Sequence, residues 1–497
     1  SKSVDRAGKP VVIRDPQTRQ PFPGNLIAPD RLSAVAVNYL KLAVPLPNYP
    51  INGPNGLSQR ASRPWGNDQF LVKLDYLLSN SHKLSGAYFW SDTSDGQPFL
   101  GDIDFAYRTI LSRQHNLNIH EYWTIGPNKL NHFRATFSRS AGNRKVTPDN
   151  ISLNDLGAKF LPLPEGPGMP PAFNVTGYFN AGSAYGGPKV ANHYVLADTL
   201  SWTRGRHNFK FGAEGWLRRL FDVSTTPAMG GQFLFDGSFT GNGLADMLLG
   251  LASQFSYGNQ TYKSNNAWAL HWFVQDNLRL TPRLALNLGL RYELTTWPVD
   301  PADALIGYRP GRQSTCVPQA PRGVVFPCDP GIPRAGAEND YNNFAPRLGI
   351  AYDLFGDGKT VVRLGYGVSY AFTIYNQLQQ GQVSTPFALR ETIRNTTLAD
   401  PYAPIGGSPF PFRKDPASLK FPASANYTFQ DFHMRNGYIQ QYNFSLQRQL
   451  GRDWSVEAAY VGNVARKLGA TTDINAPLRT PDASSTNIDQ RRPLYPT

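Results

Sequence analysis

Apolar and polar residues alternate along many stretches of the chain, as in strands with one apolar and one polar face. The clearest case spans residues 268–294, where two alternating stretches flank the turn Thr281-Pro282-Arg283. The apolar stripe of its second half consists of Leu284, Leu286, Leu288, Leu290 and Tyr292. The opposite stripe consists of Asn287, Gly289, Arg291 and Glu293. The pattern predicts a β-hairpin whose apolar face needs a cover, either a second sheet or something that is not protein.

Similar hairpins recur along the chain. Five further pairs of alternating stretches are 68–76 with 83–90, 113–124 with 130–138, 193–203 with 208–217, 345–354 with 360–372, and 438–449 with 454–464. A weaker pair, 231–236 and 253–263, encloses a segment expected to form a turn with one short helix. Together these pairs predict seven hairpins and about 14 strands.

Tight turns and long connections alternate without exception. The long connections are 92–112, 141–192, 297–343 and 373–437, and only those beside 231–263 are shorter. All tight turns therefore fall on one side of the predicted sheet and all long loops on the other. This is typical of outer-membrane barrels, which have short periplasmic turns and long extracellular loops. Most strands reach about 10 residues, enough to cross a bilayer at a tilt of about 45°.

Aromatic residues stand at the ends of the apolar stripes, where a membrane-spanning sheet meets the two interfaces. They are Tyr76, Trp90, Trp123, Trp202, Trp268, Trp272, Tyr292, Tyr352, Tyr370, Trp454 and Tyr460. The alternative, a soluble core filled by these rings, does not explain the one-sided loops. The predicted fold class is therefore all-β, an antiparallel transmembrane β-barrel with long extracellular loops.

Composition narrows the function classes. With 40% hydrophobic and 17% charged residues, the chain is not disordered. Its longest apolar run, 243–252, is too short for a transmembrane helix. The net charge of +13 raises the question of nucleic acid, but the basic residues are scattered and form no cluster. Arginines facing the lumen or an acidic lipopolysaccharide explain the charge better.

The two cysteines, Cys316 and Cys328, lie twelve residues apart in a stretch rich in Pro and Gly. Their spacing fits a local disulfide, which would form in an oxidising compartment such as the periplasm or the cell surface. Two free thiols are the alternative that spacing leaves open.

No motif indicates catalysis, a cofactor or a metal. The sequence "GDGKT" at 356–360 lacks the first glycine of a phosphate-binding loop, because Asp353 stands there. The sequence "GVSYA" at 367–371 continues a strand instead of opening a helix. His115 and His120 are five residues apart, hence on opposite faces of one strand. We expect no enzyme activity.

The polar stripes predict a lumen wall. The charged residues opposite the apolar stripes are Lys73, Asp75, Arg134, Lys210, Glu214, Arg291, Glu293, Arg347, Asp353 and Arg363. In a barrel they would hold a plug by hydrogen bonds and ion pairs and line the path of a solute. Alternatively, individual members lie beyond the membrane and are simply solvated.

Several blocks of sequence resemble the barrel of TonB-dependent outer-membrane receptors, most closely the Oar-like kind. They are "FVQDNLRLTPRLALNLGLRYE" at 273–293, "NNFAPRLGIAYDLFGDGKTVVRLGYGVSY" at 342–370, "GQFLFDGSFTGNGLADMLLG" at 231–250, and the stretches 15–48 and 440–463. The similarity extends over nearly the whole chain.

This resemblance implies a barrel of about 22 strands with a plugged lumen. It implies a receptor that binds an extracellular ligand and moves it across the bacterial outer membrane with energy supplied through TonB. The chain would be a barrel fragment without the plug. Residues 1–67 would be an early extracellular loop, 68–465 the barrel hairpins and 466–497 the start of the next loop.

The partners expected on this basis are outer-membrane lipid and lipopolysaccharide, the receptor's own plug, TonB and an unknown extracellular ligand. The loops 141–192, 297–343 and 373–437 are the best candidates for ligand contact. A passive porin-like channel or a surface adhesin on the same barrel is an alternative function. A third alternative is a soluble carbohydrate-binding β-sandwich.

Overall fold

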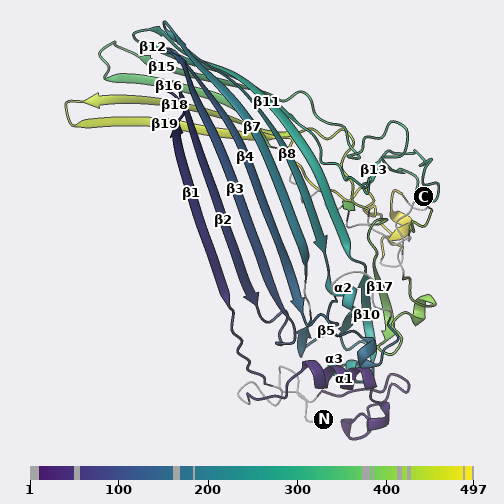
Figure 1. Cartoon of the computed structure of the whole chain (residues 1–497). Helices are drawn as coiled ribbons and strands as arrows, with labels where there is room; N and C mark the ends of the chain where they lie inside the picture. Colours follow the sequence, from purple (N-terminus) through teal and green to yellow (C-terminus); the bar gives the residue numbers. More distant parts are fainter. Residues whose placement is uncertain are drawn as a thin grey trace.

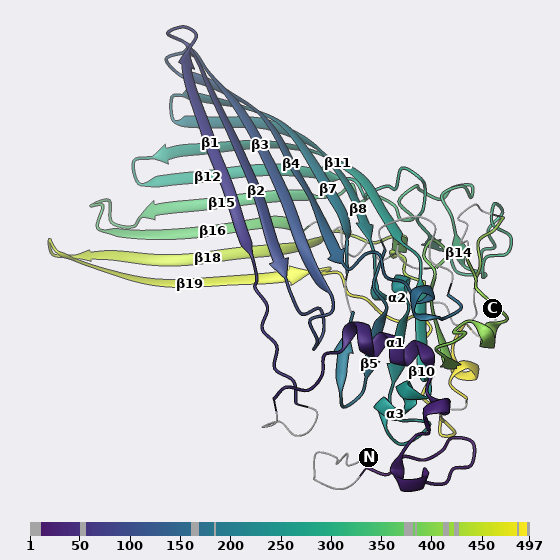
Figure 2. The same cartoon turned by 60° about the horizontal axis from the view of Figure 1, so that its bottom comes forward.

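The chain folds around one large antiparallel sheet (Figure 1). The computed structural model describes residues 11–49, 56–160, 168–182, 185–371, 381–382, 385–410, 417–421, 427–484 and 487–494. The sheet has 12 strands in the order β1-β2-β3-β4-β7-β8-β11-β12-β15-β16-β18-β19, and each strand pairs with the next of the set along the chain. The sheet curls strongly between β1 and β19 (Figures 1 and 2).

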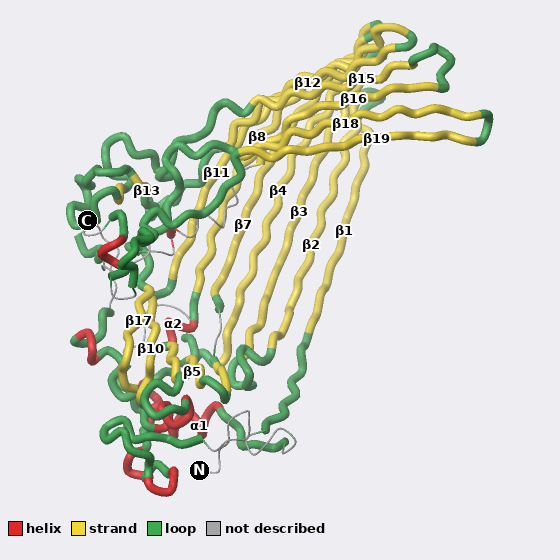
Figure 3. Tube along the Cα trace, turned by 180° about the vertical axis from the view of Figure 1, so that it is seen from behind, coloured by secondary structure: helices red, strands yellow, loops and turns green. Residues whose placement is uncertain are grey.

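The six strong hairpins are confirmed. Their strands are β1 (Trp65–Leu77), β2 (His82–Gln97), β3 (Tyr107–Gly126), β4 (Lys129–Thr147), β7 (Gly187–Arg204), β8 (His207–Ser224), β11 (Thr261–Thr281), β12 (Leu284–Thr295), β15 (Phe344–Asp353), β16 (Thr360–Ala371), β18 (Gly437–Leu450) and β19 (Trp454–Arg466). Their six tight turns lie at one end of the sheet and all long connections at the other (Figure 3). Of the predicted strands, only residue 372, the last of 360–372, lies outside the described residues. Parts of the predicted loops 141–192 and 373–437 and of the terminal segments 1–67 and 466–497 also lie outside them.

The seventh, weaker hairpin is not part of this sheet, so the predicted number of about 14 strands is wrong. β9 (Gln232–Phe235) and β10 (Leu251–Gly258) do pair, around the short helix α3 (Gly243–Leu248), but in a separate sheet. Residues 261–263 belong to β11. β9 and β10 are too short to cross a bilayer, and their apolar side chains are buried among protein side chains.

The outer face of the 12-stranded sheet is an exposed apolar surface. One row crosses five strands through Leu286, Ile350, Leu364, Phe444 and Tyr460, each directly opposite the next. Leu364 and Phe444 are each 44% exposed and Tyr460 is 62% exposed. No second sheet covers this face in the described part of the chain, so the soluble β-sandwich alternative is wrong. The cover that the opening hairpin needs is lipid, as in an outer-membrane barrel.

The sheet is taller on one side than on the other. β3, β4, β7, β8 and β11 have 20, 19, 18, 18 and 21 residues, whereas β12, β15 and β16 have 12, 10 and 12. Since the tight turns share one end, the extra length extends toward the long connections. We call β3, β4, β7, β8 and β11 the tall part of the wall.

At the loop end, five separate segments fold together into a compact unit that we call the cap (Figure 2). Its sheet has the order β17-β10-β9-β5-β6, and α1 (Ala34–Ala43) packs against it. The remaining strands of this sheet are β5 (Ala172–Val175), β6 (Phe179–Ala181) and β17 (Arg390–Thr397). Its core is aromatic: Phe173, Phe233, Phe235 and Phe255 are fully buried.

Short elements complete the fold. They are η1 (Pro23–Asn25), η2 (Pro29–Arg31), η4 (Asn154–Leu156), α2 (Pro227–Gly230), β13 (Gly307–Tyr308), β14 (Val324–Val325), η5 (Ala403–Ile405) and η6 (Asp489–Arg491). In the part of the chain that the structure describes, no helix is long and apolar enough to cross a bilayer.

A new charge is predicted to destabilise the protein more on the outer face of the wall than on the inner face. Leu288→Lys places an ammonium group in the middle of the outer apolar stripe and is expected to cost about 2–4 kcal/mol of folding free energy in lipid. Gln441→Lys, on the inner face, is the matched control and is expected to cost less than about 1 kcal/mol. Denaturant unfolding in lipid vesicles measures both values. Equal costs would contradict the assignment of the faces.

Candidate functional site

A line of charged side chains crosses the inner face of the wall. Arg134 of β4 and Glu214 of β8 form an ion pair, with 2.8 Å between Nη2 and Oε2. The pair spans the strand between them, where Ala197 of β7 stands opposite both residues. A larger side chain than alanine at 197 would stand between the two charged groups.

The line continues on the next two strands. Glu214 lies opposite the buried His271 of β11, and His271 lies opposite Glu293 of β12. Glu293 is also bound by Arg291, with 2.8 Å between Nε and Oε1. We call Arg134, Glu214, His271, Glu293 and Arg291 the lumen row. The row has an arginine at each end, and between them the carboxylates of Glu214 and Glu293 stand on either side of His271. Each carboxylate forms an ion pair with one arginine, so this level of the inner face is polar and its charges are balanced.

Two further predicted residues lie on the same face farther along the sheet. Arg347 stands opposite Gly289 and Gly367 on its two neighbouring strands. The absence of side chains at these glycines leaves room for the guanidinium to extend over the sheet. Arg363 donates from Nη1 to Oε1 of Gln447 at 2.7 Å. Neither arginine forms an ion pair within the described part of the chain.

Asp353 has a different position from the others. It lies at the last residue of β15 and accepts hydrogen bonds from the backbone N–H groups of Gly356 and Gly358 at 3.0 and 2.8 Å. Both glycines have positive φ, so the carboxylate stabilises a turn that depends on glycine. Asp353 is therefore a turn residue at the rim of the wall.

The inner face of the tall part contains an open hollow of about 670 Å³. Its polar lining includes Gln114, Asn116, Ser138, Ser140, His193 and Arg218, and Phe89 borders it. The short side chains in its lining are Ser138 and Ser140 on β4 and Ala191 on β7. Sequence reasoning missed this site, because its residues come from strands far apart in the chain and form no local motif.

His115 and His120 lie on opposite faces of β3, as predicted. His115 Nδ1 is 2.8 Å from the Tyr88 hydroxyl on the outer face. His120 Nδ1 is 2.9 Å from Nε2 of His132 on the inner face, where Tyr122 stacks on His132. Within the described ranges, no three or more His, Cys, Asp and Glu side chains are arranged to hold a metal ion.

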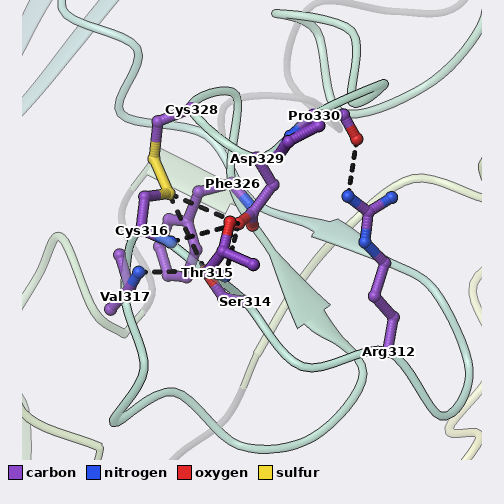
Figure 4. Close-up of a disulfide and its surroundings, with 9 residues drawn as sticks. All are labelled: Arg312, Ser314, Thr315, Cys316, Val317, Phe326, Cys328, Asp329 and Pro330. Atoms are coloured by element: carbon purple, nitrogen blue, oxygen red, sulfur yellow. Dashed lines mark hydrogen bonds between the residues drawn. A yellow bond between two sulfur atoms is a disulfide. The ribbon is translucent and has the colours of Figure 1, made fainter.

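The connection 297–343 contains a disulfide between Cys316 and Cys328 (Figure 4). The neighbouring Asp329 is only 2% exposed. Its carboxylate accepts hydrogen bonds from the N–H of Thr315 at 2.7 Å and from the N–H of Phe326 at 2.9 Å. Burial would raise the pKa of Asp329, but these donors stabilise the charged form and hold its pKa below the usual value.

Buried polar contacts tie the long loops to one another and to the wall. Asp340 binds Arg435 Nη1 at 2.7 Å and the N–H of Asn436 at 2.9 Å, which joins two long connections. Gln382 accepts a hydrogen bond from Nδ2 of Asn265, on β11, at 3.0 Å. These contacts connect described residues of 297–343 and 373–437 to each other and to β11.

Much of the apolar surface of these loops is used internally. Residues of 141–192 supply β5, β6 and part of the cap core, and residues of 373–437 supply β17. Exposed large side chains on the loops include Tyr185, Tyr341 and Ile405. Among the described residues of the loops, these large side chains are therefore not used in the internal cores.

Comparison with known proteins agrees with the fold, because the family that matches consists of outer-membrane barrels. Residues 2–497 match the family described as "Outer membrane beta barrel domain". No curated protein matches the chain.

Solved structures are similar at low identity. The outer membrane transporter YddB from Escherichia coli has 9% identity and a TM-score of 0.46, over 82% of this chain and 41% of that one. The ferric-catecholate import receptor Fiu from Escherichia coli K12 has 12% identity and a TM-score of 0.43, over 86% and 53%. The siderophore receptor PiuA from Acinetobacter baumannii has 12% identity and a TM-score of 0.39, over 80% and 49%. The matched part of each is about half its length.

The position of Asp329 predicts a pH-dependent loop. Because its folded-state pKa lies below the unfolded value, its stabilisation is present above about pH 4 and is lost as the pH falls through the folded pKa. Asp329→Asn should therefore destabilise the connection 297–343 by about 1–3 kcal/mol at pH 7 and by much less near pH 3. Hydrogen exchange of peptides from this loop, corrected for intrinsic rates, measures the difference.

Asp303→Asn is the control, since Asp303 lies in the same connection and forms an exposed pair with Arg334. This variant should change protection by less than about 0.5 kcal/mol. An Asp329→Asn effect of the same size at both pH values would show that the charge of Asp329 is not what holds the loop.

Proposed function

The chain belongs to the family of outer membrane beta barrel domains, and from this membership we propose that it is the barrel of a TonB-dependent receptor of the Oar-like kind. It binds an extracellular ligand with its loops and moves the ligand through the lumen with energy supplied from the inner membrane. Resemblance of the sequence blocks at 231–250, 273–293 and 342–370 supports this subtype. The barrel has about 22 strands and encloses a plug.

The lumen row is the observation that carries the proposal. Arg134, Glu214, Glu293 and Arg291 are partly exposed on the inner face of the wall and form a charged band several strands wide. A wide barrel lined by such groups gives a plug many hydrogen-bond and ion-pair partners. A plugged lumen opened by an energised partner also gives affinity and accumulation, which a permanently open pore does not.

The cap supports the binding step. Described residues of 141–192 and 373–437 share the aromatic core of the cap, and buried polar contacts join 373–437 to 297–343, so these loops present an ordered surface. An ordered surface pays less conformational entropy on binding than free loops. Ligand contact is proposed at its exposed residues, among them Tyr185 and Tyr341.

A surface adhesin is the second candidate. The specific observation in its favour is the cap itself, because a folded unit with a core at the loop end could bind a partner without any transport. A passive porin-like channel on the same barrel has less support, since a permanently open pore gives neither affinity nor accumulation.

Conductance of the intact protein in planar bilayers with potassium chloride separates these functions. A plugged receptor is expected to remain closed, whereas a passive channel conducts steadily. Glu214→Gln with Glu293→Gln leaves Arg134 and Arg291 without their carboxylates and should loosen the plug. We expect at least a tenfold higher open fraction in this double variant.

The matched control removes two carboxylates from the outer face, Asp68→Asn with Asp92→Asn, and should leave the protein closed. Steady conductance of the unmodified protein would refute the receptor and favour the channel. A closed protein whose conductance is unchanged in the lumen variant would show that the lumen row does not hold a plug.

A further inference from the structure

Four basic side chains lie on the outer face of the tall part of the wall, in its half toward the long connections. They are Arg113 of β3, Arg139 and Lys145 of β4, and Arg219 of β8. We call these four residues the outer basic patch.

Strand alternation fixes the face. Arg139 is two residues from Phe137, and Arg219 is two residues from Leu217, so each shares the side of the sheet of its apolar neighbour. Across the sheet, Arg139 and Arg219 both stand opposite Asn192 of β7, one on each side. The patch therefore lies on the outer face of the wall, and Arg139 and Arg219 stand on the loop side of Phe137 and Leu217.

The charges of the patch are only partly balanced. Arg113 binds both oxygens of Asp92, at 3.3 and 3.1 Å. Arg139 instead donates to the neutral amide of Asn192 at 2.8 Å. Within the described part of the chain, neither Arg139 nor Arg219 has a carboxylate within ion-pair distance. Lys145 has the carboxylate of Asp149 at 3.8 Å. The four basic groups thus stand against three carboxylates, Asp68, Asp92 and Asp149, a surplus of one positive charge that is centred on Arg139 and Arg219.

Exposed rings and aliphatic groups surround the patch on the same face. Tyr107, Leu111, Phe221 and Tyr262 are 40–45% exposed. Phe221 lies opposite Val190, next to the row that contains Arg219. The surface thus combines guanidinium groups with aromatic rings. It lies on the loop side of the wall, where we expect the headgroups of the outward-facing leaflet.

The short side of the wall has no such surface. At its loop end the outer face carries Phe344, Tyr370 and Tyr438, and among the described residues of β12 to β19 only Arg466 adds a positive charge there. A basic rim required merely for contact with any membrane would surround the whole sheet. Confinement to the tall part indicates one localised binding site.

We propose that the outer basic patch binds the phosphorylated headgroup of lipopolysaccharide in the outward-facing leaflet. Guanidinium groups bind phosphate through two parallel hydrogen bonds, and Arg139 and Arg219 have no competing carboxylate. The apolar faces of sugar rings pack on the exposed rings of Tyr107, Phe221 and Tyr262. The extra height of the wall brings these groups to the depth of sugars and phosphates instead of acyl chains.

This site depends on the outer-membrane location and not on transport. Binding of lipid to the intact, delipidated protein is measured by native mass spectrometry with three probes: bisphosphorylated lipid A, phosphatase-treated lipid A and phosphatidylglycerol. We expect the bisphosphorylated lipid to bind at least tenfold more tightly than either of the others. Equal binding of the phosphatase-treated lipid, or of phosphatidylglycerol, would overturn the proposal.

Variants locate the site. Arg139→Gln with Arg219→Gln should weaken binding of the bisphosphorylated lipid at least tenfold. Arg139→Lys with Arg219→Lys keeps the positive charge but removes the planar guanidinium groups that donate two parallel hydrogen bonds to a phosphate. This variant should weaken binding about threefold. The matched control, Arg452→Gln with Arg466→Gln, removes two exposed arginines elsewhere on the wall and should change it less than twofold.

Unchanged binding in the Gln double variant, or equal weakening in the control, would refute the site. Thermal unfolding in the same detergent shows that each variant is folded, and the Lys variant keeps the test decisive if the Gln variant is not. Bilayer conductance is independent of this measurement, so failure of the lipid site and failure of the proposed transport are distinguishable.

Discussion

A polypeptide that crosses hydrocarbon must bond its own N–H and C=O groups, because no water is available to them. The 12-stranded sheet meets this constraint with an uninterrupted antiparallel ladder from β1 to β19. The two irregularities of register, at Thr124/Gly126 and Arg279/Thr281, both lie beside tight turns. Irregular backbone is thus kept away from the membrane-spanning part of the wall, and everything else in the fold is attached to this ladder.

The ladder produces two unlike faces because successive side chains point in opposite directions. The outer face buries its leucines and aromatic rings in lipid, whereas the inner face assembles groups that lipid would exclude. The lumen row shows how closely the inner face is fitted. Arg134 reaches Glu214 over two strand spacings because Ala197 between them is small.

Long loops are costly to order unless they bury surface of their own. Here they do so in the cap, where Tyr39 of α1 stacks on Phe173 of β5 with 3.7 Å between ring centroids. Buried polar contacts such as that of Asp340 with Asn436 then join the loops to each other. The disulfide between Cys316 and Cys328 and the carboxylate of Asp329 fix the connection 297–343 in the same way. The described parts of the loops are thus held to one another by contacts within the protein.

The sequence by itself determined the six hairpins of the wall, their two faces and the side on which the loops lie, because alternation and turn residues are local signals. It misassigned 231–236 and 253–263, since a short alternating stretch looks the same whether lipid or a protein core covers it. The alignment of Glu293 with His271, Glu214 and Arg134 across the strands was decided only by the tertiary structure. So were the hollow on β3 and β4, the cap core and the gathering of Arg113, Arg139 and Arg219. Each joins residues from strands far apart in the chain, and only the register between strands brings them to one level of the wall.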